Sequence, residues 1–231
     1  MRQQLVYDWP TRIFHWLFAG LFLTAFVIAK TVDDDSSWFG THSLAGLTLG
    51  FAVLLRFVWG FVGTQHARFS DFSLNPQDLL NYFKAMLTGS KKRWAGHNPA
   101  SSWAALTMML MALGLAVTGY LMTSGGEKET FEDVHELLAN GFVIVVVLHV
   151  TGIMLHTLRH KEMIGLSMLD GKKADVAEAD TIVGSRPFVG VLLLALVVSF
   201  GIHLVKNYNS QTGSLQFFGK TLQVGEDRSD D

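Results

Sequence analysis

The stretch VHELLANGFVIVVVLHVTG, residues 134–152, decides how the rest of the chain is interpreted. After Glu136 it carries no charge, and the uncharged run continues to residue 158. It holds two histidines, His135 and His149, which are 14 residues apart. In an α-helix this spacing brings both side chains to nearly the same face, about 21 Å apart along the axis. One helix could therefore present two ligands at two depths of a hydrocarbon core about 30 Å thick.

Four further uncharged stretches make this helix one of five. Hydrophobic residues form 49% of the chain and charged residues 16%, whereas an average soluble domain has about 25% charged residues. A spanning helix needs about 20 mostly apolar residues, and the runs do not alternate as the strands of a barrel would. The sequence therefore predicts an all-α membrane protein rather than a soluble protein with very apolar core helices. The uncharged stretches are residues 13–29, 36–55, 94–126, 137–158 and 187–205.

The first four spans are predicted to form one domain, and the fifth span is predicted to be a separate element outside it. Residues 1–170 form a four-helix transmembrane bundle, residues 171–186 a polar cytoplasmic linker, and residues 187–205 a fifth transmembrane helix. The tail, residues 206–231, is polar and is expected to be mobile apart from an apolar patch at 215–218.

Capping residues and an amphipathic pattern add local detail. Asp8 is expected to cap the first span, Ser36 or Ser37 the second, and Thr130 with Asp133 the fourth as a capping box. Residues 75–87 have apolar positions at near-helical spacing. They predict a short helix lying on the membrane surface, with a plain loop as the alternative.

Lysine and arginine are distributed unequally between the loops, which predicts the orientation. Positive charges gather before span one, between spans two and three, and between spans four and five. The other loops carry acidic groups at 33–35 and 127–133. We expect a bacterial inner membrane protein with a cytoplasmic N-terminus and a periplasmic C-terminus. The net charge of -2 comes with no basic face suited to nucleic acid. The positive groups of the three cytoplasmic regions are Arg2, Arg12, Arg68, Lys84, Lys91, Lys92, Arg93, Arg159, Lys161, Lys172, Lys173 and Arg186, whereas the two opposite loops have only Lys30 and Lys128.

Cysteine is absent from the chain. This excludes disulfides, a cysteine-ligated iron–sulfur cluster, and a covalently attached haem of the C-x-x-C-H type. A redox centre in this protein must use other ligands.

The nine histidines supply such ligands, because four of them fall at two levels of the membrane. His42 opens span two and His135 opens span four, both from the outer side. His15 in span one and His149 in span four lie at the inner level. Haem iron accepts neutral imidazoles as axial ligands, so each pair is predicted to bind one haem b through its iron. His156 is the second choice for His149. His66, His97 and His160 are expected to be solvated loop residues, and His203 to face the interface or a partner.

Small and cationic residues near these histidines fit the same interpretation. Gly46 and Gly50 follow His42, while Gly141 and Gly152 accompany the histidines of span four. The alternative for each glycine is close helix packing, but together with the histidines they support a slot for a porphyrin. Two cations, Arg12 and Arg56, are candidates to pair with haem propionates. The alternatives are a topology charge for Arg12 and snorkelling to the membrane surface for Arg56.

Three segments resemble the bacterial cytochrome b561 family, which includes the b-type cytochrome subunits of nickel–iron hydrogenases. They are VYDWPTRIFHW at residues 6–16, HSLAG at 42–46, and the opening stretch at 134–152. HNP at 97–99 is similar as well. The resemblance covers about residues 5–170 and implies a four-helix core with two haems b. It also implies electron transfer between quinone and a periplasmic cytochrome c or a membrane-bound redox enzyme.

The predicted function is therefore that of an electron-transfer protein, or a subunit of an oxidoreductase complex, in a respiratory chain. One alternative is a self-contained superoxide/quinone oxidoreductase, which a basic outer funnel would favour; the outer loops here are acidic. An alternative of another class is a non-haem membrane transporter or assembly protein. The expected partners include the lipid bilayer and quinone. The sequence is also compatible with assembly of this chain into a homo-oligomer.

Overall fold

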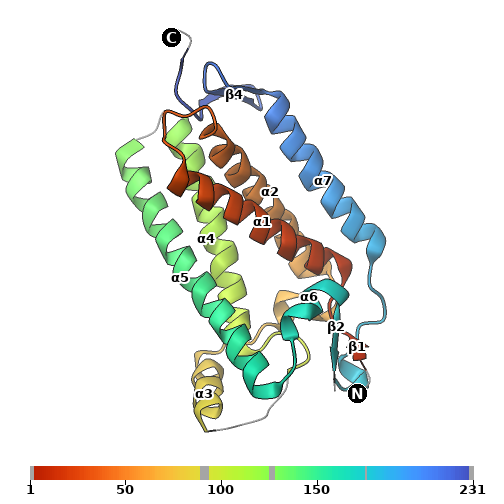
Figure 1. Ribbon diagram of the computed structural model, residues 1–231. Coiled ribbons are helices and arrows are strands. Elements are labelled where there is room, and N and C mark those ends of the chain that lie inside the picture. The colour runs from red at the N-terminus through yellow and green to blue at the C-terminus, as the bar shows by residue number, and fades with distance from the viewer. Residues whose placement is uncertain (1–2, 89–93, 125–127, 175, 229–231) are drawn as a thin grey trace. The chain divides into compact units, whose positions relative to one another are not determined.

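Five long helices dominate the computed structural model, which describes residues 3–88, 94–124, 128–174 and 176–228, without the side chain of His160 (Figure 1). Each of the five is long and apolar enough to cross a membrane. The expectation of an all-α membrane protein is confirmed, and both His135 and His149 lie in the single helix α5. The helices are α1 (Trp9–Thr31), α2 (Gly40–Val62), α4 (Pro99–Thr123), α5 (Lys128–His160) and α7 (Pro187–Lys206).

Shorter elements connect these helices. The helix predicted on the membrane surface is present as α3 (Pro76–Leu87). The others are strands β1 (Gln3–Leu5), β2 (Lys172–Ala174), β3 (Tyr208–Asn209), β4 (Ser214–Phe217) and β5 (Lys220–Gln223), helix α6 (Ser167–Asp170), and single turns η1 (Gln65–Ala67), η2 (Phe69–Asp71), η3 (Ile164–Leu166) and η4 (Glu178–Asp180).

Local hydrogen bonds explain where several helices begin. Asp8 Oδ1 accepts from Thr11 N at 2.9 Å, as predicted for the cap of α1. Asn75 caps α3 in the same way, through Gln77 N. Asn98 Oδ1 accepts from Ser101 N at 2.8 Å. The next residue, Pro99, opens α4 with the missing N–H that a first helical position tolerates.

Two predicted caps are wrong. Helix α2 begins at Gly40, after a turn in which Phe39 N donates to Ser36 O. Neither Ser36 nor Ser37 is therefore its cap. Helix α5 already includes Lys128, so Thr130 and Asp133 lie inside it and form no capping box at its start. The basic residues Lys91, Lys92, Arg93 and Arg2, which carried part of the orientation argument, lie outside the described residues.

The chain divides into two compact units. The first comprises Met1–His15, Leu55–Met109 and Val143–Leu192, and the second comprises Trp16–Leu54, Leu110–Phe142 and Leu193–Asp231. Each long helix contributes one segment to each unit. His15 and His149 belong to the first unit, and His42 and His135 to the second. Each predicted pair of ligands is therefore contained in one unit.

In the first unit, buried polar contacts tie the N-terminal segment to later parts of the chain. Strand β1 pairs antiparallel with β2, with Gln4 opposite Lys173. Asp8 is fully buried and also accepts from Trp59 Nε1 at 3.1 Å and Thr64 Oγ1 at 2.6 Å. Ser185 O accepts from Trp9 N at 2.8 Å. The segment 171–186 is therefore folded against the N-terminus rather than being a plain polar linker.

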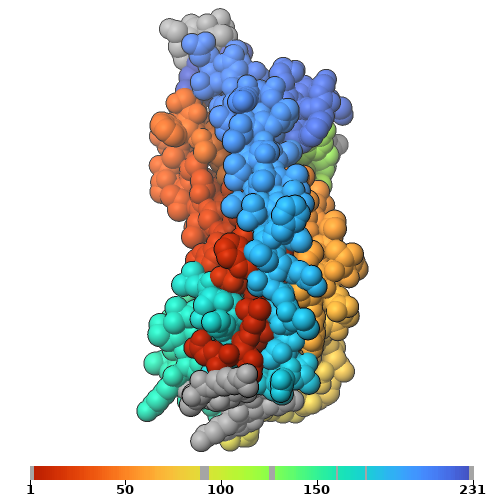
Figure 2. Space-filling view, turned by 90° about the vertical axis from the view of Figure 1, so that its right-hand side faces the viewer, coloured from red at the N-terminus to blue at the C-terminus, as the bar shows by residue number. Residues whose placement is uncertain are grey.

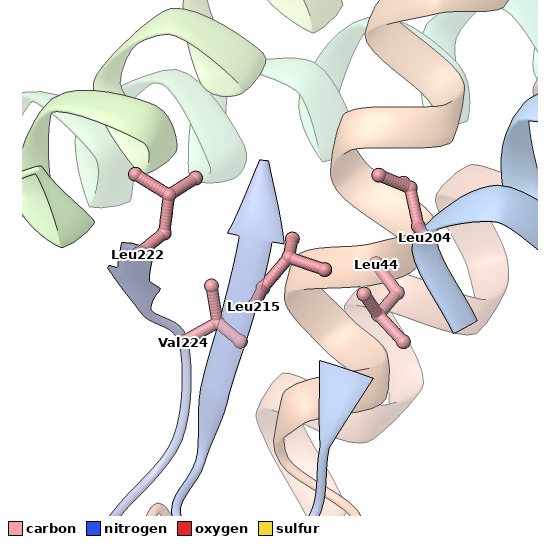
Figure 3. Packing of buried hydrophobic residues seen from close by; sticks show 5 residues of the cluster. All are labelled: Leu44, Leu204, Leu215, Leu222 and Val224. Atoms are coloured by element: carbon pink, nitrogen blue, oxygen red, sulfur yellow. The ribbon is translucent and has the colours of Figure 1, made fainter. Parts of the chain in front are cut away.

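In the second unit, the tail forms a three-stranded antiparallel sheet in the order β3-β4-β5, which follows the end of α7 (Figure 1). Figure 3 shows side chains from α2, α7 and two strands converging in one cluster. Leu204, Leu215 and Leu222 are fully buried there. The expectation of a mobile tail is wrong, because alternate tail residues are apolar and find a partner surface on the helices. The cluster is Leu44, Leu204, Leu215, Leu222 and Val224.

The part of α7 that belongs to the second unit lies at the surface on the face shown in Figure 2 and continues into the tail strands. Its outward side chains are apolar: Leu196, Val198 and Ile202 are all exposed. Such a surface is expected for a helix that faces lipid on one side.

Candidate functional site

The second unit brings His42 and His135 together. The centres of their imidazole rings are 6.0 Å apart, and the ring planes are inclined at 65°. Two imidazoles on opposite sides of one metal ion, each with a metal–nitrogen bond of about 2 Å and its ring centre about 1 Å further, would have centres about 6 Å apart. The separation of His42 and His135 therefore fits two axial ligands of one haem iron.

Hydrogen bonds orient both of these rings. His42 Nδ1 lies 2.9 Å from Ala25 O, so this nitrogen carries the proton and donates. His135 Nδ1 lies 2.9 Å from Thr118 Oγ1. The Thr118 hydroxyl itself donates to Gly114 O at 2.9 Å, so it accepts from His135. In both rings the hydrogen bond uses Nδ1, so Nε2 is the nitrogen that could bind a metal. Histidines that bind metals usually have a hydrogen-bond partner on the other ring nitrogen.

The glycines near the histidines divide into two groups. A Cβ at Gly46 or Gly152 would meet no heavy atom within 4 Å among the described residues, apart from its chain neighbours and the backbone of its own helix. A Cβ at Gly50 would come within 2.6 Å of Ala116 Cβ, and one at Gly141 within 3.1 Å of Met111 Cε. Gly46 and Gly152 therefore leave room beside the histidines. Gly50 and Gly141 allow close packing of helices instead.

The first unit contains the other two predicted ligands, His15 of α1 and His149 of α5. Both are half-buried, and they lie close enough for their charges to interact. His156, the second choice, lines a different feature, a cavity described below. The choice of His149 rather than His156 as the counterpart of His15 stays a prediction.

The two candidate cations have different surroundings in the first unit. Arg12 donates to Leu169 O and lies 5.4 Å from the ring centre of Trp9. Arg56 is only 3% exposed. It donates through Nη2 to Ala67 O at 2.8 Å. Arg56 is therefore held inside the protein, whereas part of the Arg12 guanidinium is occupied by a main-chain carbonyl.

The prediction that His66 and His97 are solvated is wrong. His66 is 2% exposed, and its Nδ1 lies 2.9 Å from Asp71 Oδ2 while its Nε2 lies 2.7 Å from Asp180 O. His97 is partly covered by the rings of Tyr7 and Phe72, at 5.8 and 4.7 Å between centres, and its Nδ1 atom is buried. His203, near the end of α7, is exposed, and its neighbour Asn207 donates to its carbonyl. The side chain of His160 lies outside the described residues.

These two loop histidines differ in pKa. Burial lowers the pKa of His97 to about 3, with the charges of Lys173 and Arg56 acting in the same direction. Burial also acts to lower the pKa of His66, but the hydrogen bonds to the Asp71 carboxylate and the Asp180 carbonyl outweigh it, so the pKa is raised. Both ring nitrogens of His66 face acceptors, which suits the doubly protonated imidazolium.

The first unit also contains a cavity of about 940 Å³ between α3, the end of α5 and the segments 94–98 and 162–180. Gly152 and His156, which follow His149 along α5, form part of its wall. Apolar side chains such as Leu155 and Ile164 line it together with the polar groups of Tyr82 and Asn98. Charged side chains line it as well, among them Asp78, Arg159 and Lys173. The volume is in the range that is typical of a small-molecule site.

Comparison with known proteins agrees with this pattern. The sequence profile of the family described as prokaryotic cytochrome b561 matches residues 6–171. The chain belongs to this family. It is therefore a multi-pass membrane protein of a family of b-type haem-binding cytochromes, and the resemblance seen in the sequence is confirmed.

Two curated relatives of this cytochrome are similar over part of their length. A probable Ni/Fe-hydrogenase B-type cytochrome subunit from Rhizobium leguminosarum bv. viciae is 30% identical over 152 residues, covering 55% of this chain and 63% of that protein. A protein of the same description from Rhodobacter capsulatus is 25% identical over 146 residues, covering 52% and 55%. The chain thus spans about six-tenths of the length of these relatives. No solved structure matches the chain.

Several polar groups around these sites were not predicted from the sequence. Thr118 is the partner of His135 although it lies in another helix, and a Cβ at Gly119 would be 3.6 Å from the His135 ring. The motif HNP at 97–99 places His97 directly before a helix, because Asn98 and Pro99 are typical of a helix start. Nothing in the local sequence indicates that the chain before this start is covered by Tyr7 and Phe72.

Proposed function

We propose that this cytochrome binds two haems b, one between His42 and His135 and the other between His15 and His149. The observation that carries the proposal is the His42–His135 pair, with ring centres 6.0 Å apart and both Nδ1 atoms hydrogen-bonded. The two pairs use ligands 14 residues apart on α5. Bound haem supplies reversible one-electron chemistry, and two imidazole ligands favour electron transfer over oxygen binding.

The protein contributes ligand orientation and electrostatics. Ala25 and Thr118 hold the rings of His42 and His135 in one tautomer, which raises the basicity of the iron-facing nitrogen. Gly46 and Gly152 leave space for the edges of a porphyrin. Arg56 supplies positive charge for the propionates of the haem held by His15 and His149. Arg12 contributes to this charge through the part of its guanidinium that does not donate to Leu169 O.

Electrons are proposed to pass between the quinone pool and a periplasmic or membrane-bound redox partner. With the N-terminus in the cytoplasm, the His15–His149 pair and the cavity beside α3 lie at the cytoplasmic side of the inner membrane. The cavity is the proposed quinone site, because it joins apolar walls to groups that can hydrogen-bond a quinone oxygen, such as Tyr82 and His156.

The partner on the periplasmic side would meet the haem held by His42 and His135. The relatives described as hydrogenase cytochrome subunits support a membrane-bound redox enzyme such as a hydrogenase. The exposed acidic residues of the second unit would equally suit the basic rim of a periplasmic cytochrome c. They are Asp33, Asp34, Asp35, Glu129, Glu132, Asp133, Glu136, Glu226 and Asp227.

Two measurements test this function. A pyridine haemochromogen assay on purified protein should give two haems b per chain, and a value of one or none contradicts the pairing. Quinol should reduce the haems of the unaltered protein. Filling the cavity with Leu155→Trp should slow this reduction and leave the haem content unchanged. Leu148→Trp is the control, because Leu148 is exposed on the same helix and does not line the cavity. Equal rates in the two variants would rule out the cavity as the quinone site.

A further inference from the structure

Buried polar atoms without a hydrogen-bond partner are concentrated in one of the two units. Among the described residues, five buried side-chain atoms lack a partner, and all five belong to the first unit. Most buried polar groups in folded proteins are paired, so each exception calls for an explanation. The five atoms are Thr11 Oγ1, Arg12 Nε, Arg56 Nη1, His97 Nδ1 and Trp103 Nε1.

Three of these atoms belong to residues that the structure connects with His15 and His149, namely Thr11, Arg56 and His97. Thr11 precedes His15 by one turn on α1, so the two residues share a helix face. Arg56 lies over the ring of Phe14, at 5.9 Å from the ring centre, and Phe14 is the neighbour of His15. His97 is close enough to both Arg56 and His149 for electrostatic interaction.

The position of His97 is fixed by the main chain before it. Lys173 Nζ donates to Ala95 O at 2.8 Å and to Gly96 O at 2.9 Å. The Tyr7 hydroxyl also donates to Gly96 O, at 3.2 Å. Hydrogen bonds therefore fix the segment before His97, and His97 Nδ1 is buried without a partner. Such a side chain can bind a group from outside the chain without rearranging.

A cation and an imidazole whose buried nitrogen atoms lack partners fit an anionic oxygen ligand. The guanidinium is always charged, so Arg56 Nη1 requires an acceptor. The described neighbours of His97 that carry charge are mostly cationic, Lys173 and Arg56 among them. Two carboxylates lie nearby, and both are already engaged. Asp71 pairs with His66. Asp8, which is close enough to Arg56 for electrostatic interaction, accepts hydrogen bonds from Thr11, Trp59 and Thr64. A carboxylate brought in by a cofactor would satisfy both atoms.

We propose that His97 and Arg56 together bind a propionate of the haem held by His15 and His149, so that this haem directs its propionates toward the start of α4. The proposal rests on the two-haem function proposed above and adds His97 as a positioning residue. Ordered water that bridges Arg56 and His97 without any haem contact is the competing explanation.

The experiment is a redox titration of each haem in purified holoprotein, with the haem of the first unit identified as the one that His149→Ala removes. A positive charge near a haem favours the reduced form. Arg56→Gln should therefore lower the midpoint potential of that haem, by about a tenfold change in the reduction equilibrium, which is about 59 mV for a one-electron couple. Arg56→Lys should retain most of the potential.

The His97 variants separate a bond to the propionate from a packing role. His97→Leu removes the buried nitrogen and should lower the same potential. His97→Asn places an amide where Nδ1 was and should restore it. The matched controls are Arg68→Gln, an exposed arginine in the same unit, and His203→Gln, an exposed histidine in the other. Neither control should move the potential of the haem held by His15 and His149.

Equal potentials in His97→Leu and His97→Asn, both unchanged from the unaltered protein, would overturn the proposal and favour bridging water. A shift of both haems to the same extent would overturn it as well. If Arg56→Gln does not fold, the His97 pair decides. A preparation of unaltered protein with fewer than two haems refutes the proposed function instead, and the haem assay detects that before any titration.

Discussion

The two histidine pairs illustrate two ways of preparing a cofactor site. In the second unit, His42 and His135 already have the separation of axial ligands, and their outer nitrogens are hydrogen-bonded within the protein. The first unit, which contains His15 and His149, also contains every buried side-chain polar atom without a partner that the described residues include. If both pairs bind haem as proposed, the site of the second unit is organised around its metal ligands, and that of the first unit has polar atoms for the periphery of the cofactor.

The largest expected effect comes from removing axial ligands one at a time. His42→Ala and His135→Ala should each remove the same haem, which halves the haem content. His15→Ala and His149→Ala should each remove the other, because a ligand lost from one unit leaves the second pair intact. Haem content and reduced-minus-oxidised spectra measure this. Loss of both haems from a single variant would contradict two independent sites, and His156→Ala is the matched control.

The tail sheet offers a test of how far the second unit depends on its own core. Leu215 is fully buried, and large-to-small changes at such positions cost about 2–5 kcal/mol. Leu215→Ala should therefore lower the unfolding temperature and release the haem of the second unit before that of the first. Thermal scans followed by haem absorbance measure this. Phe218→Ala is the control, because Phe218 is 75% exposed. Simultaneous loss of the two haems would show that the units do not unfold separately.

A smaller effect should follow from loosening one ligand ring. Thr118→Val removes the hydroxyl that accepts from His135 Nδ1. Loss of such a partner weakens metal-site affinity by about 10–100-fold. It also makes the imidazole less basic, so the potential of this haem should rise. Haem transfer to apomyoglobin and redox titration measure the two quantities. Thr48→Val is the control, since Thr48 donates only to Leu44 O. A change in the other haem would contradict the assignment.

The smallest effect concerns the ion pair of His66 and Asp71 in the first unit. The pKa of His66 is raised in the folded protein. The ion pair therefore stabilises the folded protein fully at any pH below the ordinary histidine pKa. It is lost as pH rises through the raised value. We expect a loss of about 1 kcal/mol across that window, seen as a falling unfolding temperature of the unaltered protein. His66→Gln should remove this dependence of the unfolding temperature on pH. Lys173 and His97 are other titratable groups nearby, and both remain in this variant. A slope of the opposite sign would contradict a protonated His66.

The helical pattern was predictable because each span records its own environment. An uncharged run of about 20 residues must form a helix in lipid, and all five such runs do. Asp8, Asn98 and Pro99 act over single turns, so the helix starts at α1 and α4 could also be inferred. The capping signals at Ser36 and Thr130 were misleading, since short polar motifs compete with contacts from distant residues.

The sequence by itself determined the five spans, the family and the four candidate ligands, because hydrophobicity and helical periodicity are local properties. Only the tertiary structure decided what surrounds these ligands. Thr118 and Ala25 come from other helices than the histidines they orient, the tail folds on Leu44 and Leu204, and His66 and His97 are covered by segments far away in the chain. Burial and hydrogen bonding are properties of residues brought together by folding, so no local pattern encodes them.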